Sequence, residues 1–331
     1  MSHRVAVIGG GSWGTTVAVL TCRNAPTTLW CRRPGLAEEV NTRHTNCDYL
    51  DGFTLPAELA ATSSLEEAVT GADLLVMGVP SHGMRATLTE LAPYVTPGIP
   101  VVSLAKGLEQ GTDLRMTQVI AEELPGHPTG VLTGPNLARE ILAGQAAASV
   151  VAFDDHDVAV ELQHVFAGDL FRVYTNDDVV GCELAGALKN VFAIASGMAD
   201  GLGTGDNTRA AVITRGLAEL ARLGVAMGGQ PMTFSGLAGM GDLVATCISR
   251  QSRNRYVGEQ LGLGRTIEEI QAEMKMVAEG VKTAKVVMDL ARRHDVDMPI
   301  VTEVYGVLYE GRTAEDAYRG LLRRASGREH R

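Results

Sequence analysis

Three arginines fall within the seven residues 249-SRQSRNR-255, with Ser252 and Asn254 between them. Guanidinium and side-chain amide groups form forked, charge-assisted hydrogen bonds with phosphate. The cluster therefore predicts a phosphate-binding site, although a solvated loop or the start of a helix has a similar composition. The net charge of −10 argues against nucleic acid and anionic membrane as partners, so an anionic ligand needs a local basic site of this kind.

Lys189 and Asn190 lie side by side in the apolar stretch 183-ELAGALKNVFAIA-195. The surrounding residues predict a helix that is buried in protein. An ammonium group in such surroundings is costly unless something compensates for its lost hydration. Either Lys189 has a partner or ligand in the interior, or its stem packs while its head reaches solvent.

A third chemical motif, 9-GGGSWG-14, has the G-x-G-x-x-G spacing of Gly9, Gly11 and Gly14. It directly follows the strand-like run 4–8 and opens a helical pattern, as a dinucleotide-binding turn requires. Gly9 permits the tight turn, Gly11 lets the backbone approach the pyrophosphate, and Gly14 allows close packing of helix on strand. The motif predicts a nucleotide cofactor, the alternative being an ordinary glycine-rich turn.

The end of the next strand indicates which cofactor is bound. NAD sites usually carry Asp or Glu about 20 residues after the glycines, to hold the ribose 2′-hydroxyl. This chain has no acid between Asn24 and Ala37 and has Arg32 and Arg33 instead. Two arginines suit a 2′-phosphate, so NADPH is favoured over NADH; the alternative is a pair of surface arginines beside Pro34.

Two further strand ends should face the same crevice. Lys106 lies between the apolar run 100–105 and Gly107, and we predict that it enters the crevice as a cation rather than lying on the surface. Ser81 and His82 end another strand, and we interpret them as turn residues.

The elements that must position these residues differ between the two halves of the chain. Strand-like runs occur at 4–8, 28–31, 73–79, 100–105, 130–134, 147–153 and 171–175, with helical patterns such as 12–22 and 113–124 between them. Long helical patterns follow at 179–199, 208–224, 266–278 and 280–294. Alternation of strands and helices predicts a mostly parallel sheet that binds ligands at the carboxyl ends of its strands. The expected fold class is α/β, with a Rossmann-type doubly wound sheet in residues 1–178 and an all-α domain in residues 179–331.

The five cysteines are scattered and lack C-x-x-C spacing, which suits the reducing cytoplasm and predicts no disulfide framework or metal site. The N-terminus has no signal-peptide pattern. The stretch 179–199 is long enough to cross a bilayer, but Glu183 and Lys189 would then sit in hydrocarbon at about 2.5–3.5 kcal/mol each. No membrane insertion is expected.

Seven segments, in order along the chain, resemble the soluble bacterial type of NAD(P)-dependent glycerol-3-phosphate dehydrogenase. They are 9-GGGSWGT-15, 103-SLAKGLE-109, 133-TGPNLARE-140, 183-ELAGALKNVFAIA-195, 201-GLGTGDNT-208, 236-GLAGMGDLVATC-247 and 252-SRNR-255. The resemblance implies reversible reduction of dihydroxyacetone phosphate to sn-glycerol 3-phosphate with NADPH or NADH. It also implies a Rossmann domain followed by a helical domain, in a homodimer.

The resemblance assigns roles to individual positions. The implied cofactor contacts are Gly9, Gly11, Ser12, Trp13, Gly14, Arg32, Arg33, Tyr49, Lys106, Ala138, Arg253, Val277 and Glu279. The implied substrate contacts are Lys106, Gly134, Asn136, Lys189, Asp242, Ser252, Arg253 and Asn254. The implied catalytic residues are Lys189 as proton donor and acceptor, Lys106 and Asp242. The chain departs from many bacterial members at Asn136, where they carry Ser or Thr.

The expected chemistry explains the charges. Negative charge develops on the substrate C2 oxygen during reduction, and a preorganised cation in a dry site stabilises it. Burial should lower the pKa of Lys189 toward about 7–8, where a lysine donates and recovers a proton. The like charge of Lys106 should lower it further, while Asp242 holds Lys189 or accepts from a substrate hydroxyl.

Two rival functions remain. A 3-hydroxyacid dehydrogenase or ketopantoate reductase also pairs a Rossmann half with a helical half, but it binds a carboxylate, and 252-SRNR-255 argues against it. A catalytically inactive nucleotide sensor need not keep Lys189, Asp242 and Arg253 together.

Overall fold

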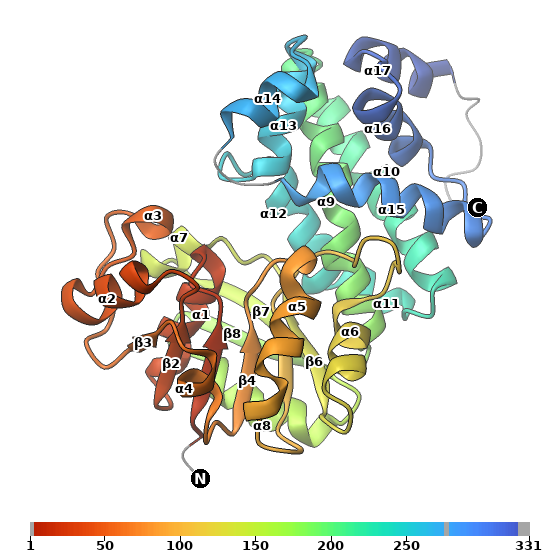
Figure 1. Ribbon diagram of the computed structural model, residues 1–331. Helices are drawn as coiled ribbons and strands as arrows, with labels where there is room; N and C mark the ends of the chain where they lie inside the picture. The colour runs from red at the N-terminus through yellow and green to blue at the C-terminus, as the bar shows by residue number, and fades with distance from the viewer. Residues whose placement is uncertain (1–2, 275–277, 324–331) are drawn as a thin grey trace.

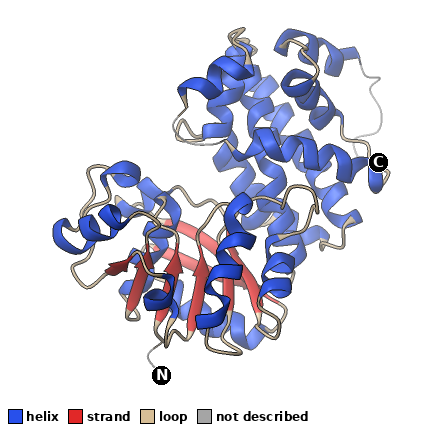
Figure 2. Ribbon diagram, in the orientation of Figure 1, coloured by secondary structure: helices blue, strands red, loops and turns tan. Residues whose placement is uncertain are grey.

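The chain folds into a sheet region and a helical region, and the helical region lies over the carboxyl ends of the central strands (Figure 1). The computed structural model describes residues 3–274 and 278–323. Residues 3–178 form a sheet with helices on both faces, and the described residues from 179 onward are helical (Figure 2). The expected fold class is confirmed.

The sheet is parallel except at one pair of strands. Among the described residues it has eight strands in the order β3-β2-β1-β4-β5-β6-β7-β8, and β6 and β7 are antiparallel. The strands are β1 (Val5–Ile8), β2 (Thr27–Trp30), β3 (Ala60–Thr62), β4 (Leu74–Met77), β5 (Val101–Ser103), β6 (Thr129–Thr133), β7 (Ala147–Phe153) and β8 (Phe171–Asn176). The sequence predicts all of these except β3, a three-residue edge strand of small residues.

Helices cover both faces of the sheet. Side chains alternate between faces along a strand, so in β1 Val5 and Val7 join one apolar cluster whereas Ala6 and Ile8 join another. The first cluster packs beneath α1 (Ser12–Cys22), α2 (Pro34–Arg43) and α8 (His156–Phe166). The second packs beneath α4 (Leu65–Val69), α5 (Ser81–Leu91) and α6 (Met116–Glu123). Shorter helical turns complete the region: α3 (Cys47–Leu50), η1 (Ala92–Tyr94) and α7 (Ala138–Leu142).

The helical region is built around α9 (Val179–Gly201). Its other elements are α10 (Asp206–Ala226), α11 (Pro231–Ser235), η2 (Leu237–Gly241), α12 (Asp242–Ile248), α13 (Arg253–Gly262), α14 (Ile267–Glu273), α15 (Glu279–Arg293), α16 (Pro299–Tyr309) and α17 (Ala314–Arg323). One apolar core runs through these helices. α9 is long and apolar enough to cross a membrane, but 94% of its most apolar window is buried inside the protein. It is the central helix of this core, as predicted for residues 179–199.

An ion pair attaches α9 to the sheet region. Glu183, in the first half of α9, accepts a hydrogen bond from Arg115 Nη1 at 2.6 Å and from the backbone N–H of Thr117 at 2.9 Å. Arg115 and Thr117 lie at the start of α6. Because the Glu183 side chain is buried, breaking this pair would leave an uncompensated charge in the interior. The ion pair therefore holds the first half of α9 against the start of α6.

Candidate active site

The glycine turn joins β1 to α1. Gly9 has φ of +130°, which L side chains rarely adopt, and a Cβ there would lie 2.7 Å from the backbone of Gly78. A Cβ on Gly14 would overlap the carbonyl oxygen of Gly9, whereas a Cβ on Gly11 would point into open space. The first N–H groups of α1 have no intrahelical partner and lie beside this space. The cradle therefore fits the pyrophosphate of a dinucleotide.

Ser12 and Trp13 begin α1, but their side chains contact the protein. Ser12 Oγ donates to the backbone oxygen of Tyr49 at 3.3 Å. The ring of Trp13 packs against Phe171 with centroids 6.4 Å apart, and its buried Nε1 has no hydrogen-bond partner among the described residues.

Arg32 and Arg33 follow β2 and are exposed. The guanidinium of Arg33 forms an ion pair with Asp48, and its central carbon lies 6.0 Å from the centre of the Tyr49 ring. Burial lowers the pKa of His82, and the charges of Lys282 and Arg32 lower it further. The sequence interpretation did not include Asp48 as a partner of Arg33.

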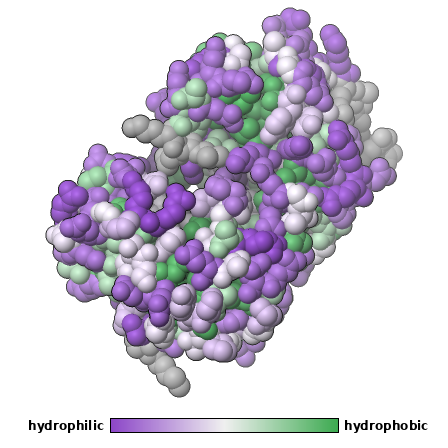
Figure 3. Space-filling model, in the orientation of Figure 1, coloured by the Kyte–Doolittle hydropathy of each residue, from purple (hydrophilic) through white to green (hydrophobic). Residues whose placement is uncertain are grey.

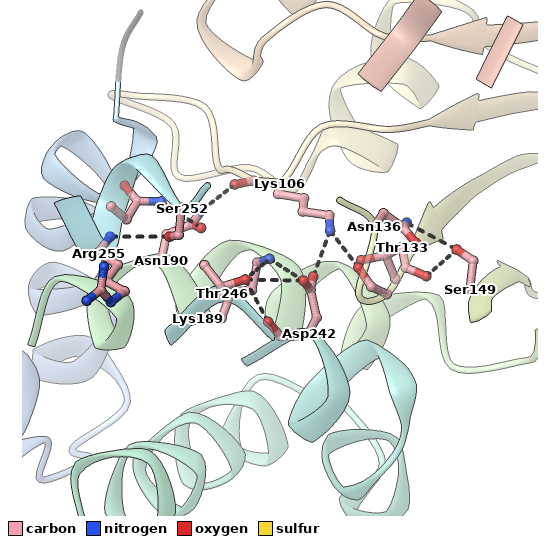
Figure 4. Close-up of polar contacts among 12 residues, drawn as sticks. Lys106, Thr133, Asn136, Ser149, Lys189, Asn190, Asp242, Thr246, Ser252 and Arg255 are labelled. Atoms are coloured by element: carbon pink, nitrogen blue, oxygen red, sulfur yellow. Dashed lines mark hydrogen bonds and ion pairs between the residues drawn. The ribbon is translucent and has the colours of Figure 1, made fainter. Parts of the chain in front are cut away.

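Asp242 stands where η2 gives way to α12. η2 is a single π-helical turn, a feature that is frequent at functional sites. The carboxylate of Asp242 is buried and forms an ion pair with Lys189, whose side chain projects from the middle of α9 (Figure 4). Lys189 Nζ also donates to Thr246 Oγ1 at 2.6 Å. Lys189 is only 5% exposed, which excludes the alternative of a lysine whose head reaches solvent.

Lys106 approaches the same carboxylate from the sheet region. It follows β5, and its Nζ donates to Asp242 Oδ2 at 2.7 Å and to the carbonyl oxygen of Gly134 at 2.8 Å (Figure 4). Asp242 therefore holds one ammonium group on each carboxylate oxygen, which confirms the prediction that Lys106 enters the crevice. The carboxylate thus contacts both lysines, and its remaining lone pairs can still accept from a hydroxyl group.

The electrostatics of Lys189 follow from this arrangement. The pKa of Lys189 is lowered to about 8 as the net result of three causes: burial lowers it most, the carboxylate of Asp242 opposes the shift, and the like charge of Lys106 adds to it. A lysine with this pKa exchanges protons readily near neutral pH. The structure thus agrees with the predicted direction of the shift and with its predicted causes.

The arginine cluster forms the start of α13. Ser252 is the N-cap, and its Oγ accepts from the backbone N–H of Arg255 at 3.2 Å (Figure 4). Asn254 Nδ2 donates to Asn190 Oδ1 at 3.0 Å, and Asn254 Oδ1 accepts from the backbone N–H of Gly280 at 2.9 Å. The N-terminal end of α13 therefore lies beside Asn190, one position from Lys189. An amide has two N–H donors, so Asn254 can offer at most one to a ligand.

Asn136 and Gly134 lie in the loop between β6 and α7. Asn136 Nδ2 donates to Ser149 Oγ at 3.2 Å, and that hydroxyl donates to the carbonyl oxygen of Thr133 at 2.7 Å (Figure 4). The Oδ1 of Asn136 and the Oγ1 of Thr133 are buried and have no hydrogen-bond partner among the described residues. Two buried polar atoms near Lys106 thus lack a partner within the described protein. Ala138, the first residue of α7, is partly exposed close by.

Glu279 is the first residue of α15. Burial raises the pKa of its carboxyl group, and the positive charges of Arg253, Lys189 and Lys106 oppose the rise. Glu279 is therefore close enough to these three cations to interact with them electrostatically. Val277 lies outside the described residues. The two regions meet in a hollow of the surface (Figure 3).

A cavity of about 20 Å³ lies between the two regions at Glu279. It is lined by Ser81, His82, Leu108, Gln110 and Glu279, with Lys282, Thr283 and Val286. Ser81 and His82 are therefore not simple turn residues as interpreted from the sequence, since they begin α5 and face the helical region.

Two residues of this network were not singled out as site residues from the sequence. Thr246 accepts from Lys189 and donates to the backbone oxygen of Asp242 at 2.6 Å. Asn190 Nδ2 donates to the carbonyl oxygen of Lys106 at 3.1 Å and so joins α9 to the sheet region. The spacing of four residues from Asp242 to Thr246 places both on one face of a helix, which could have revealed Thr246.

A dinucleotide cradle at the carboxyl end of the central strand β1, in a chain that also holds a buried lysine on a carboxylate, defines an NAD(P)-dependent oxidoreductase. The sequence matches the family described as NAD-dependent glycerol-3-phosphate dehydrogenase, its N-terminus over residues 4–159 and its C-terminus over residues 178–319. The chain belongs to this family.

Individual relatives agree along the whole length. The chain is 59% identical over 329 residues to a Sphingopyxis alaskensis protein named glycerol-3-phosphate dehydrogenase (NAD(P)+) 2, covering 99% of both chains. A Mycobacterium tuberculosis protein of the same type is 56% identical and covers 98% of this chain and 96% of its own length. The crystal structure of a glycerol-3-phosphate dehydrogenase from Coxiella burnetii superposes with a TM-score of 0.93 at 36% identity, over 98% of this chain and 99% of that one. A ketopantoate reductase from Ralstonia eutropha reaches a TM-score of only 0.58 at 15% identity, which is a likeness of fold alone.

Proposed function

We propose that this chain catalyses the reversible transfer of a hydride between NAD(P)H and dihydroxyacetone phosphate, giving sn-glycerol 3-phosphate, a precursor for glycerophospholipids. The observation that carries the proposal is the pair of ammonium groups of Lys106 and Lys189 on one buried carboxylate, Asp242. Asn190, beside Lys189, links the carbonyl oxygen of Lys106 to Asn254 at the arginine-bearing end of α13. Family membership and full-length relatives with this name support the reaction.

The cofactor would be held by the cradle of Gly9, Gly11 and Gly14 and by the backbone of Ser12 and Trp13. Tyr49, Ala138, Val277 and Glu279 are the further proposed contacts. When bound, the nicotinamide supplies the hydride in reduction and accepts it in oxidation. The residues of the chain must therefore orient the ketone, exclude water and manage the proton.

Lys189 is the proposed proton donor. Its ammonium group donates to the C2 oxygen of the ketone as negative charge develops there, and its amine recovers the proton in the reverse direction. A pKa of about 8 supports both roles near neutrality. Lys106 adds a second positive charge, and a charge held in place before the reaction needs no reorganisation during it. Asp242 and Thr246 hold Lys189 in position.

The phosphate is proposed to bind at the N-terminal end of α13. Ser252, Arg253 and Asn254 lie there, and the free N–H groups of a helix start favour an anion. Gly134 and Asn136 are proposed to contact the other end of the substrate, where the buried Oδ1 of Asn136 can accept from a hydroxyl group. The substrate is thereby anchored at one end and hydrogen-bonded at the other.

NADPH is the proposed preferred cofactor, because Arg32 and Arg33 follow β2 with no acidic residue between Asn24 and Ala37. Asp48 pairs with Arg33, but a guanidinium has five N–H donors and can serve a phosphate as well.

We also propose a division into two domains, residues 1–178 and 179–331, and a homodimer in the cytoplasm. The main apolar clusters of the sheet and of the helices support the division, although a smaller cluster packs β6 and β7 against α9, and five free cysteines support the reducing compartment. Light scattering of the purified protein would measure the mass of the assembly, and a mass near 35 kDa would reject the dimer.

Steady-state kinetics test the proposed reaction. Dihydroxyacetone phosphate should cause rapid oxidation of NADPH, which is measured as the loss of nicotinamide absorbance. 2-Dehydropantoate should cause no oxidation. Turnover of 2-dehydropantoate alone would overturn the proposal in favour of a ketopantoate reductase. Cofactor binding without any turnover would support a nucleotide sensor.

A further inference from the structure

The helices α9 and α13 contact each other through their backbones. A Cβ on Gly197 would overlap the carbonyl oxygen of Arg255, and a Cβ on Gly258 would overlap the carbonyl oxygen of Ile194. Gly201 and Gly262 are in similarly close contact one turn further on. Without side chains between them, the two helices have little freedom to slide or separate. Their mutual position therefore sets how far the start of α13 lies from Lys189 in α9.

An ion-pair network locks this helix pair at the end of α9. The carboxylate of Asp200 is buried, with 8% of its side chain exposed. Its Oδ2 accepts from Nε and Nη2 of Arg255, both at 2.8 Å, and its Oδ1 accepts from Nε of Arg209 at 2.8 Å and from Nη2 at 2.6 Å. Asp200 thus joins α9, α10 and α13 through two arginines.

Arg255 links this network to the phosphate site. It lies in the first turn of α13, and its backbone N–H donates to Ser252 Oγ (Figure 4). Its guanidinium is directed to Asp200 and to Glu259, whose Oε2 lies 3.2 Å from Nη1. Of the three arginines in the cluster, Arg255 therefore uses its guanidinium for ion pairs within the protein. Arg253 lies two residues earlier, at the start of α13.

We propose that Asp200 is a positioning residue for substrate phosphate: acting through Arg255, it fixes the first turn of α13, with Ser252 and Arg253, at a set distance from Lys189. The inference rests on the proposed function, since it assumes that the phosphate binds at this turn. It assigns to Asp200 an effect on phosphate-bearing substrate that a residue needed only for folding would not have. Displacement of a bound group by about 1 Å can lower a rate by about 100-fold.

The test compares dihydroxyacetone phosphate with dihydroxyacetone, which carries the same ketone without the phosphate. Asp200→Asn removes the charge, and Arg255→Lys keeps the charge but loses the forked contact. Glu259→Gln is the matched control, because it removes the other carboxylate that holds Arg255 without touching α9. We expect the first two variants to lower kcat/KM for dihydroxyacetone phosphate at least tenfold, chiefly through KM, and to leave kcat/KM for dihydroxyacetone within about twofold.

The outcomes separate the inference from the proposed function. An equal loss for both substrates, with a lower Tm, would reduce Asp200 to a structural role and overturn the inference, and so would a normal KM for the phosphorylated substrate. If Asp200→Asn does not fold, Arg255→Lys decides the question by the same ratio. Glu259→Gln should keep the wild-type ratio. A wild-type enzyme that does not reduce dihydroxyacetone phosphate would instead overturn the proposed function.

Discussion

Lys106 and Lys189 hold their ammonium groups on opposite oxygens of a single carboxylate, although one lysine belongs to the sheet region and the other to the helical region. The pairing through Asp242 makes this pair of cations depend on both halves of the chain. It also explains how a charge can persist on Lys189 in a nearly dry environment.

Replacing Lys189 by Ala should lower kcat for the reduction of dihydroxyacetone phosphate by about 10²–10⁴, because the reaction loses its proton donor. The affinity for NADPH should stay near normal, since Lys189 is not among the proposed cofactor contacts. Stopped-flow turnover and NADPH fluorescence titration measure the two effects. Lys285→Ala, on the exposed face of α15, is the control. Undiminished turnover in the Lys189 variant would refute the role.

The reduction should depend on pH through Lys189. Its pKa is lowered from 10.5 to about 8, so the ammonium form that donates the proton is present below pH 8 and lost above it. We expect kcat/KM for reduction to fall by about tenfold per pH unit above this value. Oxidation of sn-glycerol 3-phosphate should show the opposite trend, because it needs the neutral amine. Lys106→Met should move both limbs to higher pH by removing a like charge; a flat profile up to pH 10 would contradict the assignment.

Arg253→Ala should raise KM for dihydroxyacetone phosphate by about 10- to 100-fold, since a hydrogen bond to a charged group contributes about 1.5–3 kcal/mol. Steady-state kinetics with saturating NADPH measure the change. Arg250→Ala, which removes an exposed arginine of the same cluster, should leave KM within about twofold. An unchanged KM in the Arg253 variant would place the phosphate elsewhere.

Replacing Arg32 and Arg33 together by Ser should weaken NADPH more than NADH, because only NADPH carries the 2′-phosphate. The ratio of kcat/KM for the two cofactors should shift toward NADH by at least tenfold. Arg43→Ser, at the exposed end of α2, provides the control for a general loss of positive charge. Equal losses with both cofactors would reject the proposed 2′-phosphate site.

Stability should depend on pH through Glu219 in α10, which no catalytic step uses. Burial raises its pKa to about 7, outweighing the backbone N–H donors of Ile300 and Val301 at the start of α16. The folded state therefore holds this proton more tightly than the unfolded state. The corresponding stabilisation is complete below pH 4.5 and is lost as the pH rises through 7. In a thermal-melt series between pH 5 and 8, Glu219→Gln should flatten the decline in Tm; the same slope as the wild type would contradict this account.

The sequence predicts most of the fold because local patterns and the final structure agree. The expected helix at 12–22 is α1, and the apolar stretch at 179–199 is α9. The strand β3 was missed because Ala60–Thr62 is short and carries little β-forming signal. The helices α16 and α17 were missed as well, although α17 has acidic residues in its first turn, a basic residue in its last turn and a strongly amphipathic pattern.

The candidate site was less predictable from the sequence than the fold. Motifs alone indicated the glycine cradle, because its spacing directly reflects backbone geometry. The meeting of Lys106 with Asp242, 136 residues apart, depends on the topology that brings the end of β5 to α12. The spacing of residues in the sequence could not reveal the ion pair of Arg33 with Asp48 or that of Arg255 with Asp200. Each ion pair depends on how a loop or helix packs against a distant element.

The wide turn η2, immediately before Asp242, has a bearing on how this protein tolerates insertions and deletions. Each residue of a regular helix turns the chain by about 100°. Loss of one residue between Leu237 and Gly241 would let the turn tighten into ordinary helix and swing the carboxylate away from both lysines. A segment without charged side chains thus has a length that must be kept, while substitutions that preserve its small residues can be absorbed.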